Sequence, residues 1–448
     1  MEIELKSIKN RVFFVGVGGI SMSALAKLCQ LNGWVVAGSD AVKTAETIKL
    51  EQYFKVYYSH KESNIINFNP SLVVYTGAIK PDNPELNYAQ KMGIKLVERS
   101  EFLGNICKNY KHVIAVAGTH GKTTTTAMIA EIFVKAGLNP TVHVGGNVVN
   151  LKGNLVVGDN NYFITEACEY KNSFKHIISD VAVITNIEAD HMDCYSSFSE
   201  LENAFINFSN NANYCVLNSA NLLVEKVKNK GLILLNSALG YEVKNIKKCG
   251  VGYSFTVYEN GLYLGNFRLN VMGEYNIQNA LNAIAVSRKF GINLSTIYSA
   301  LLGFNGVERR NEFLGEINGT PVFADYCHHP TEIASSIKAF REHYKNILCI
   351  FQPHTYSRTK ALKHEFATCF KGVKKLVLFK TYAARELPTD GLSETDMFKF
   401  VKNRNKELVL TGANLLNIIT QESANFNAVI VLGAGDVYSV VKNGLTFN

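Results

Sequence analysis

The sequence predicts an α/β protein built from parallel sheets with helices on both faces. Short apolar runs such as residues 12–17, 181–187 and 347–351 are bounded by glycine, asparagine or aspartate. Most of these runs are followed by segments with helical periodicity, an alternation typical of parallel strands that are buried on both faces. The 448 residues are about three times the usual domain length, so we expect two or three domains.

The first predicted unit starts with the strand at residues 12–17 and continues through a helix to a second strand at residues 34–37. This order is the layout of a βαβ nucleotide-binding unit. Ser21 stands where a dinucleotide-binding motif would have its third glycine, after Gly16, Gly18 and Gly19. A nicotinamide site, a site for another nucleotide such as a UDP-sugar, and close packing of strand on helix all stay open.

The second predicted unit carries the strongest motif, a glycine-rich turn between a strand at residues 113–116 and a helix that begins near Lys122. Backbone N–H groups of such a turn surround phosphate oxygens, Lys122 reaches the β- and γ-phosphates, and the hydroxyl of Thr123 can ligate Mg²⁺. ATP is therefore the predicted ligand. Val116 occupies the position of the general motif's first glycine, so a plain glycine turn before a helix is the alternative.

Two connectors divide the chain into domains. One lies near Lys108, before the second glycine-rich unit. The other is the segment Gly303-Phe304-Asn305-Gly306, which precedes a new alternation of strands and helices. The predicted domains are therefore residues 1–108, 109–305 and 306–448.

Polar clusters follow predicted strands in the second and third domains, at the sheet edge where α/β proteins bind ligands. Residues 165–169 and 186–193 contain carboxylates, which hold Mg²⁺ well together with phosphate, although a single acidic residue is more often a helix cap. Residues 324–332 and 351–359 contain paired histidines and an arginine, whose guanidinium binds carboxylate or phosphate through a planar fork of donors. The histidine pair could equally be a structural cap.

The composition excludes several classes of protein. With 46 basic and 38 acidic residues the net charge is +8, which suits an anionic substrate without requiring a nucleic-acid partner. Nine cysteines without a C-x-x-C pair argue against a disulfide framework and against zinc, and they fit reduced thiols in the cytoplasm. The amino terminus has no signal-peptide pattern and no apolar run approaches ~18 residues, so we expect no membrane span.

Together these motifs resemble the Mur ligases of bacterial peptidoglycan synthesis, and within them the members that join L-alanine to UDP-N-acetylmuramate. The likeness runs from Val12 to about Gly435. The amino-terminal glycine loop is a weak signal, whereas the phosphate loop and the His-His-Pro-Thr-Glu run are specific. The matching segments are residues 16–23, 38–40, 76–79, 83–85, 118–125, 186–191, 276–280, 306–310, 325–332 and 351–359.

The resemblance implies three domains: a Rossmann-like domain for the UDP part of the substrate, a central P-loop ATPase domain, and a Rossmann-like carboxy-terminal domain for the amino acid. It implies an ATP-dependent ligase with Mg²⁺ that works in the cytoplasm as a monomer or homodimer. The lactyl carboxylate of UDP-N-acetylmuramate would attack the γ-phosphate to form an acyl phosphate. The amine of L-alanine would then attack that acyl phosphate.

The resemblance also implies a role for each matching residue. Four of them would be catalytic, namely Lys122, His191, Arg309 and His328. The ATP site would consist of Gly118, Thr119, His120, Gly121, Lys122, Thr123, Thr124, Asn276, Asn279, Arg310 and Asp325, with adenine at the two asparagines and ribose at the aspartate. The UDP-sugar site would consist of Gly18, Gly19, Ser39, Asp40, Thr76 and Ala78. L-alanine would contact Tyr326, His328 and Arg358, and Mg²⁺ would be held by Thr123, Glu166 and His191.

Some positions depart from the family pattern, mostly on the amino-acid side. Thr355 replaces a basic residue, Ala324 and Cys327 replace an acid and a glycine, and residues 166–170 read Glu-Ala-Cys-Glu-Tyr instead of Glu-Ala-Asp-Glu-Ser. The alternative substrate is the murein tripeptide of cell-wall recycling, while folylpolyglutamate synthesis is disfavoured because those enzymes lack the amino-terminal UDP unit. Two other classes stay open: a nicotinamide-dependent oxidoreductase and a nucleotide-binding protein without turnover.

Overall fold

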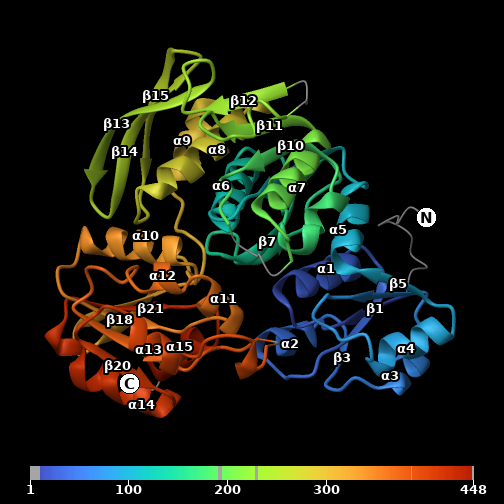
Figure 1. Cartoon of the computed structure of the whole chain (residues 1–448). Helices are drawn as coiled ribbons and strands as arrows, with labels where there is room; N and C mark the ends of the chain where they lie inside the picture. The colour runs from blue at the N-terminus through green and yellow to red at the C-terminus, as the bar shows by residue number, and fades with distance from the viewer. Residues whose placement is uncertain (1–10, 190–193, 228–230, 385, 446–448) are drawn as a thin grey trace. The chain divides into compact units, whose positions relative to one another are not determined.

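The structure, a computed structural model, describes residues 11–189, 194–227, 231–384 and 386–445 (Figure 1). The chain forms two compact units. The first unit contains Met1–Asn245, Phe255–Phe267 and Asn279–Phe304, and the second unit contains Ile246–Ser254, Arg268–Gln278 and Asn305–Asn448. In the part of the chain that is described, no helix is long and apolar enough to cross a membrane.

An amino-terminal sheet opens the first unit. Its strands are parallel in the order β3-β2-β1-β4-β5, with β1 (Arg11–Val15) in the centre next to β4 (Leu72–Tyr75). Because the strand order reverses at β1, the loops after β1 and β4 lie where such sheets bind ligands. The other elements are β2 (Val35–Ser39), β3 (Lys55–Tyr57), β5 (Lys95–Glu98), α1 (Ile20–Leu31), α2 (Ala45–Leu50), α3 (Glu62–Phe68), α4 (Pro84–Lys91) and α5 (Arg99–Cys107).

Capping residues mark the start of three helices that follow strands of this sheet. Asn83 accepts hydrogen bonds from two N–H groups of the first turn of α4, and Pro84 follows as the first helical residue. Thr44 and Thr47 form a capping box at the start of α2. Before α5, the carboxylate of Glu98 accepts from the N–H of the second helical residue. These caps fix where the chain leaves each strand and turns back over the sheet.

A second sheet lies mainly in the first unit, in the order β15-β14-β13-β12-β11-β10-β6-β9-β7-β8, and parts of β13, β14 and β15 belong to the second unit. In it β6 (His112–Ala117) runs parallel to both neighbours, β9 (Tyr162–Glu166) and β10 (Ser179–Ile184). The remaining strands are β7 (Thr141–Val148), β8 (Gly153–Val156), β11 (Ala212–Asn218), β12 (Gly231–Leu235), β13 (Tyr241–Cys249), β14 (Gly252–Glu259) and β15 (Leu262–Leu269). The helices are α6 (Lys122–Lys135), η1 (Tyr170–His176), α7 (Phe198–Asn210), α8 (Tyr275–Lys289) and α9 (Leu294–Leu302).

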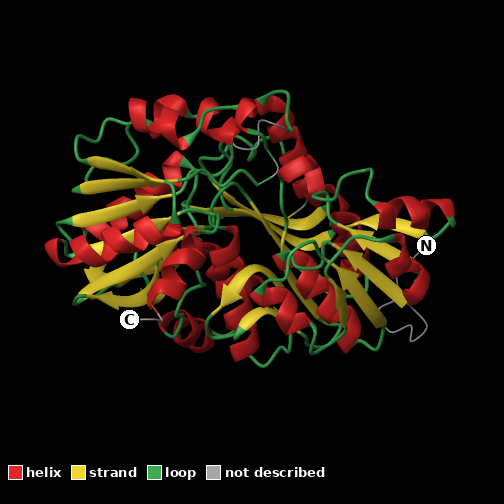
Figure 2. Ribbon diagram, turned by 90° about the horizontal axis from the view of Figure 1, so that it is seen from below, coloured by secondary structure: helices red, strands yellow, loops and turns green. Residues whose placement is uncertain are grey.

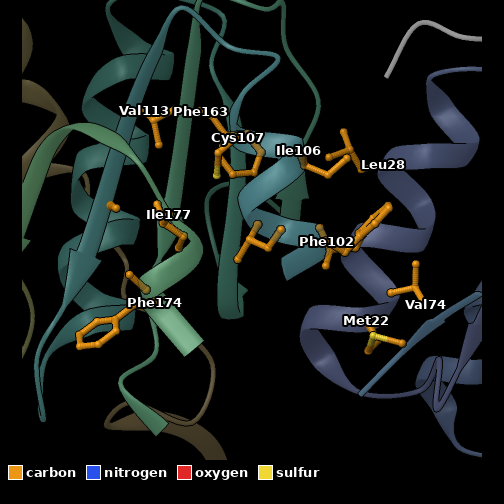
Figure 3. Packing of buried hydrophobic residues seen from close by; sticks show 14 of the residues in the cluster. Met22, Leu28, Val74, Phe102, Ile106, Cys107, Val113, Phe163, Phe174 and Ile177 are labelled. Carbon is orange, nitrogen blue, oxygen red and sulfur yellow. The ribbon is translucent and has the colours of Figure 1, made fainter. Parts of the chain in front are cut away.

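Helix α5 links the two sheets of the first unit through one hydrophobic core. Figure 3 shows Phe102, Ile106 and Cys107 of α5 packed between residues of the amino-terminal sheet and residues of the central sheet. A Cβ on Gly104 would lie 2.3 Å from the carbonyl oxygen of His176, so only glycine lets α5 approach η1 this closely. The amino-terminal and central sheets therefore share a single core.

The second unit contains the third sheet, in the order β16-β17-β21-β18-β19-β20. Every pair in it is parallel except β16 with β17. Buried clusters cover both faces of the sheet, and Figure 2 shows helices on either side of the strands. The elements are β16 (Glu312–Ile317), β17 (Thr320–Asp325), α10 (Pro330–Arg341), β18 (Ile347–Phe351), α11 (Tyr356–Ala361), α12 (Lys363–Phe366), β19 (Lys375–Phe379), η2 (Pro388–Asp390), α13 (Glu394–Phe400), β20 (Lys406–Val409), α14 (Gly412–Glu422), η3 (Ser423–Asn425), β21 (Ala428–Leu432) and α15 (Val437–Leu445).

The predicted fold class is confirmed, because each of the three sheets is mainly parallel and flanked by helices. The strand predicted at residues 347–351 coincides with β18. The strand predicted at residues 181–187 ends earlier, at Ile184. The physical reason is that the residues after Ile184 leave the sheet and form hydrogen bonds with the phosphate loop.

Candidate active site

The predicted phosphate loop connects the end of β6 to the start of α6. Gly118 has φ +132° and Gly121 has φ +81°, both in the region that favours glycine. A Cβ on Gly118 would lie 2.0 Å from the hydroxyl oxygen of Thr185, and a Cβ on Gly121 would lie 2.6 Å from Oδ1 of Asn279. The loop therefore needs glycine at both positions to close against its neighbours.

The segment that follows β10 holds this loop in place. Asn186 accepts from the N–H of Thr119 through its carbonyl (3.0 Å) and from the N–H of His120 through Oδ1 (2.9 Å). The hydroxyl of Thr185 donates to the carbonyl of His120 at 2.6 Å. The N–H of Glu188 donates to the hydroxyl of Thr119 at 2.9 Å. These four hydrogen bonds between the loop and its partner segment fix the backbone before any ligand arrives.

Positive groups face the mouth of the loop. Helix α6 starts at Gly121 with no side-chain cap and no acidic residue in its first turn, so its N–H groups and dipole can receive an anion. Nζ of Lys122 donates to the carbonyls of Gly118 and Thr119 and to Oε1 of Glu169 at 2.9 Å. Burial is the largest single influence and alone would lower the pKa of Lys122, but the charge of Glu169, the hydrogen bond to it and the nearby Cys168 and Glu166 together outweigh burial and raise the pKa above its usual value. Lys122 is therefore held as a cation beside the helix N-terminus, a donor set that fits a polyphosphate.

Oxygen ligands for a divalent cation lie on the same sheet edge. Thr123 is buried in the first turn of α6, and Glu166 ends β9, the strand next to β6. Oε1 of Glu166 accepts from the N–H of Gly145 at 2.6 Å, which fixes the carboxylate. Hydroxyl and carboxylate oxygens are the ligands that Mg²⁺ prefers, so these residues fit that ion. His191, the third predicted ligand, lies outside the described residues.

The two predicted adenine-binding asparagines have different surroundings. Oδ1 of Asn279 accepts from the hydroxyl of Thr125 at 3.2 Å, in contact with the phosphate loop. Nδ2 of Asn276 donates to the carbonyl of Met272 at 2.7 Å, at the start of α8. Both side chains are buried. Asn279 thus lies against the phosphate loop, and the adenine role of both residues stays a prediction.

The amino-terminal glycine loop follows β1 and carries a carboxylate. A Cβ on Gly16 would lie 2.8 Å from the methyl group of Thr76, and a Cβ on Gly18 would lie 2.8 Å from Oδ2 of Asp40. The N–H of Gly18 donates to that carboxylate oxygen at 2.9 Å. The structure therefore brings Gly18, Asp40 and Thr76 together, with Gly19 as the N-cap of α1 and Ala78 in the turn after β4.

Ser39 belongs to a buried hydrogen-bond network around Glu85, and the sequence had predicted no role for Glu85. Its hydroxyl donates to Oε2 of Glu85 at 2.7 Å, and Nδ1 of His60 contacts the same oxygen at 2.7 Å. Nδ2 of Asn64 donates to the other oxygen of Glu85, which is fully buried. The hydrogen bond to Glu85 raises the pKa of His60. The family likeness had included Asn83-Pro84-Glu85, and this motif was the available signal.

In the second unit, residues that are predicted to bind the nucleotide lie near the end of β17. Asp325 ends that strand, is buried, and accepts from the hydroxyl of Ser336 at 2.8 Å. Burial raises the pKa of Asp325 to about 6, although Arg310 opposes the shift. The guanidinium of Arg309 stacks on the ring of Tyr326 at 4.6 Å and donates to the carbonyl of Gly433 at 3.0 Å. Arg309 thus supports the loops here, and its catalytic role stays a prediction.

The three residues predicted to bind L-alanine lie in one cluster of the second unit. The ring of His328 is 5.6 Å from the ring of Tyr326 and 5.6 Å from the ring of His354. Nη1 of Arg358 is 3.2 Å from Nδ1 of His354. Burial, assisted by the charges of His328 and Arg358, lowers the pKa of His354 to about 3. His354 was not assigned a role from the sequence, yet it joins the predicted residues into one group.

The departures from the family pattern occupy constrained positions of this cluster. Thr355 is the N-cap of α11 with φ +68°, and its N–H donates to the carbonyl of Tyr382 at 3.0 Å. Ala324 and Cys327 are buried, and burial raises the pKa of the Cys327 thiol well above its usual value. A neutral buried thiol acts as a small apolar group.

Profiles of known families match the chain in three consecutive parts. The profile described as Mur ligase family, catalytic domain, matches residues 11–111, and the Mur ligase middle domain matches residues 116–287. The profile described as Mur ligase, glutamate ligase domain, matches residues 309–436. The chain belongs to the Mur ligase family. The family predicted from the motifs is thereby confirmed.

Individual Mur ligases resemble the chain over its full length. The UDP-N-acetylmuramate–L-alanine ligase of Clostridium acetobutylicum is 40% identical over 454 residues, covering 98% of each chain. The enzyme of the same name from Clostridium tetani is 40% identical and covers 97% of each. The crystal structure of the UDP-N-acetylmuramate–alanine ligase of Thermotoga maritima superposes with a TM-score of 0.85 at 28% identity, covering 98% of this chain and 99% of that one. A murein peptide ligase of Psychrobacter arcticus has the same fold, with a TM-score of 0.75 at 23% identity over 98% of each chain.

Proposed function

We propose that this protein uses ATP to join L-alanine to the lactyl carboxylate of UDP-N-acetylmuramate, in the synthesis of peptidoglycan precursors. The observation that carries the proposal is the preformed phosphate loop with Lys122 held as a cation at the start of α6. The full-length likeness to enzymes of that name supports the choice of substrates. The alternative, ligation of murein tripeptide, is less well supported because the similarity to peptide ligases is lower.

The proposed reaction proceeds in two steps, phosphorylation of the carboxylate and attack by the amine. An oxygen of the lactyl carboxylate attacks the γ-phosphorus of ATP, and the bond from that phosphorus to the bridging oxygen breaks, releasing ADP. The amine of L-alanine then attacks the acyl carbon, and phosphate departs with the bonding electrons while the nitrogen loses a proton. Lys122 neutralises charge that develops on the phosphoryl oxygens, a preorganised contribution worth about 3 kcal/mol.

The remaining assignments place each substrate in one domain. Thr123, Glu166 and His191 would hold Mg²⁺, which supplies charge neutralisation between phosphate oxygens when bound. Residues 1–108 would bind the UDP-sugar through Gly18, Asp40 and Thr76. Residues 109–305 would bind ATP, and residues 306–448 would bind L-alanine through Tyr326, His328 and Arg358.

We also propose a cytoplasmic location, which the spacing of the nine cysteines supports.

A phosphate-release assay on the purified chain tests the function. We expect release only when ATP, Mg²⁺, UDP-N-acetylmuramate and an amino acid are all present, with L-alanine faster than glycine, L-serine or murein tripeptide. Mass spectrometry should find one UDP-muramoyl-alanine for each phosphate. Release at the same rate without an amino acid would contradict ligation, and a preference for tripeptide would favour the recycling reaction.

A further inference from the structure

Arg99, the first residue of α5, has a half-buried side chain without an ionic partner. Its Nη1 contacts the hydroxyl oxygen of Ser21 at 3.5 Å. Among the residues that the structure describes, no carboxylate oxygen lies within 4.0 Å of its guanidinium. Other arginines of the first unit are paired: Arg288 with Glu259 at 3.1 Å, and Arg11 with backbone carbonyls. An unpaired guanidinium that is partly removed from water is costly, which points to a missing anion.

The guanidinium lies beside the predicted sugar site, and hydrogen bonds connect its partner Ser21 to the predicted Mg²⁺ site. Ser21 follows the glycine loop by two residues, on the first turn of α1. Towards the other site, Nε2 of His143 lies 3.0 Å from the hydroxyl oxygen of Ser21, and its Nδ1 lies 2.9 Å from the hydroxyl oxygen of Thr165, the residue before Glu166. Arg99 therefore contacts the turn that follows the glycine loop, and hydrogen bonds through His143 and Thr165 connect this turn to Glu166.

A directed chain of hydrogen bonds fixes the partner of Arg99. The hydroxyl of Thr165 donates to the carbonyl of Glu166 at 3.1 Å, so it accepts from Nδ1 of His143 at 2.9 Å. Nε2 of His143 then accepts from the hydroxyl of Ser21 at 3.0 Å. This leaves the oxygen of Ser21 as an acceptor that faces Arg99. In this arrangement Nδ1 of His143 donates and Nε2 accepts, so the imidazole of His143 is neutral and carries its proton on Nδ1.

A second contact holds the same turn of α1 against the central sheet. Nδ2 of Asn154, on β8, donates to the carbonyl of Ile20 at 2.8 Å. Together with His143 on β7, it fixes the first turn of α1 from the other side of the shared core. The position of Arg99 is thus determined by groups from both sheets of the first unit.

We propose that Arg99 binds the lactyl carboxylate of the sugar substrate and then the acyl phosphate formed from it. A guanidinium presents a planar fork that matches both anions and stays charged throughout. Bound in this way, the carboxylate is held near Glu166 and the phosphate loop with its negative charge compensated. The proposal rests on the proposed function, since only that reaction brings a sugar-linked carboxylate to this place.

Calorimetric titration with two sugar nucleotides tests Arg99 without turnover. UDP-N-acetylmuramate differs from UDP-N-acetylglucosamine only by the lactyl ether that carries the carboxylate. We expect Arg99→Met to weaken binding of UDP-N-acetylmuramate by about 10- to 100-fold and to leave UDP-N-acetylglucosamine within about twofold. Arg99→Lys should give an intermediate affinity, because an ammonium keeps the charge but loses the fork. Lys108→Met removes an exposed cation just beyond the other end of α5 and should change neither affinity.

Each of the remaining outcomes contradicts either the role of Arg99 or the ligation reaction, and it leaves the other proposal intact. Equal loss of both affinities in Arg99→Met would make Arg99 a structural residue, and no loss of either would remove it from the site. A wild-type chain that does not prefer the lactyl sugar would also overturn its role. If wild type shows the expected preference but never forms an amide, ligation fails while the assignment of Arg99 stands.

Discussion

The phosphate loop at residues 118–122 and the glycine loop at residues 16–19 share a backbone design but not a charge. Each follows the strand at which its parallel sheet reverses order, and each leads into a helix. Lys122 and an uncapped helix N-terminus face the first loop. The carboxylate of Asp40 accepts from the second loop and so occupies one of its N–H groups. A glycine loop therefore fixes where a ligand lies, while neighbouring charges decide which part of the ligand is bound.

The loops also differ in how tightly they are enclosed. Gly118 has no room for a Cβ, because Thr185 and the backbone of Asn186 lie 2.0 to 3.1 Å away. Gly19 has an ordinary φ of −66°, and the nearest atom to its Cβ would be 3.7 Å away. The phosphate loop is thus rigid before binding, as a site for a developing phosphoryl charge should be. The amino-terminal loop is more open and leaves room for a larger ligand.

The largest expected effect is loss of charge at the phosphate loop. Lys122→Met removes the cation that we propose acts on the γ-phosphate, so we expect kcat to fall by about 10³-fold. Affinity for UDP-N-acetylmuramate should stay within about twofold, because that site belongs to the other loop. Initial rates of phosphate release and calorimetric titration of the sugar nucleotide measure the two quantities.

The opposite end of the same helix provides the control for Lys122. Lys135 ends α6 and donates to the carbonyl of Ser299, so Lys135→Met removes a cation of equal charge away from the loop. We expect this variant to keep wild-type turnover. Near-normal turnover in Lys122→Met would remove the charge difference on which the comparison of the loops depends.

A smaller expected effect distinguishes the two loops by how tightly each one is enclosed. We expect Gly118→Ala to destabilise the chain by about 2 kcal/mol and to raise the KM for ATP, because the added methyl group meets Thr185 and the backbone at positive φ. Gly19→Ala should change stability by about 0.5 kcal/mol or less, since nothing crowds that position. Thermal unfolding measures both variants. Equal destabilisation of the two would show that the loops are equally enclosed.

The phosphate loop could be predicted from sequence because its parts are neighbours in the chain. Gly118, Gly121 and Lys122 lie within five positions, between a buried strand and a helix, and local geometry alone gives them a function. The predicted family and fold class rested on such segments and are confirmed. The length of the strand after residue 181 was predicted wrongly, since nothing local shows that Thr185 leaves the sheet to bind the loop.

Residues whose partners are remote in sequence could not be found in this way. Arg99 and Ser21 are separated by 78 positions, and Ser21 and His143 by 122. No periodicity or spacing reports such a contact, because it depends on how one sheet packs on another. Glu85 was within a recognised motif, but its burial against Ser39 and His60 required the folded sheet.

The last expected effect concerns His143, which lies between Ser21 of α1 and Thr165 of β9, and it appears only as a change with pH. Burial, with the charge of Arg99 adding to it, lowers the pKa of His143 to about 4. The unfolded chain takes up a proton near pH 6.5 and the folded chain does not, so stability falls as the pH falls from 6.5 to 4. His143→Gln removes this titration, and the difference between wild type and variant should change by about 3 kcal/mol across that window. Urea unfolding followed by the fluorescence of the single tryptophan, Trp34, reports on the amino-terminal sheet.

An exposed histidine supplies the comparison for His143. His364→Gln on α12 is the matched control, because it makes the same substitution at an exposed side chain. A wild-type stability that stays level from pH 6.5 to 4, relative to His143→Gln, would mean that the imidazole accepts a proton in the folded chain. Nε2 could then no longer accept from Ser21, and the hydrogen-bond chain that joins the glycine loop to Glu166 would not have the direction that places Arg99.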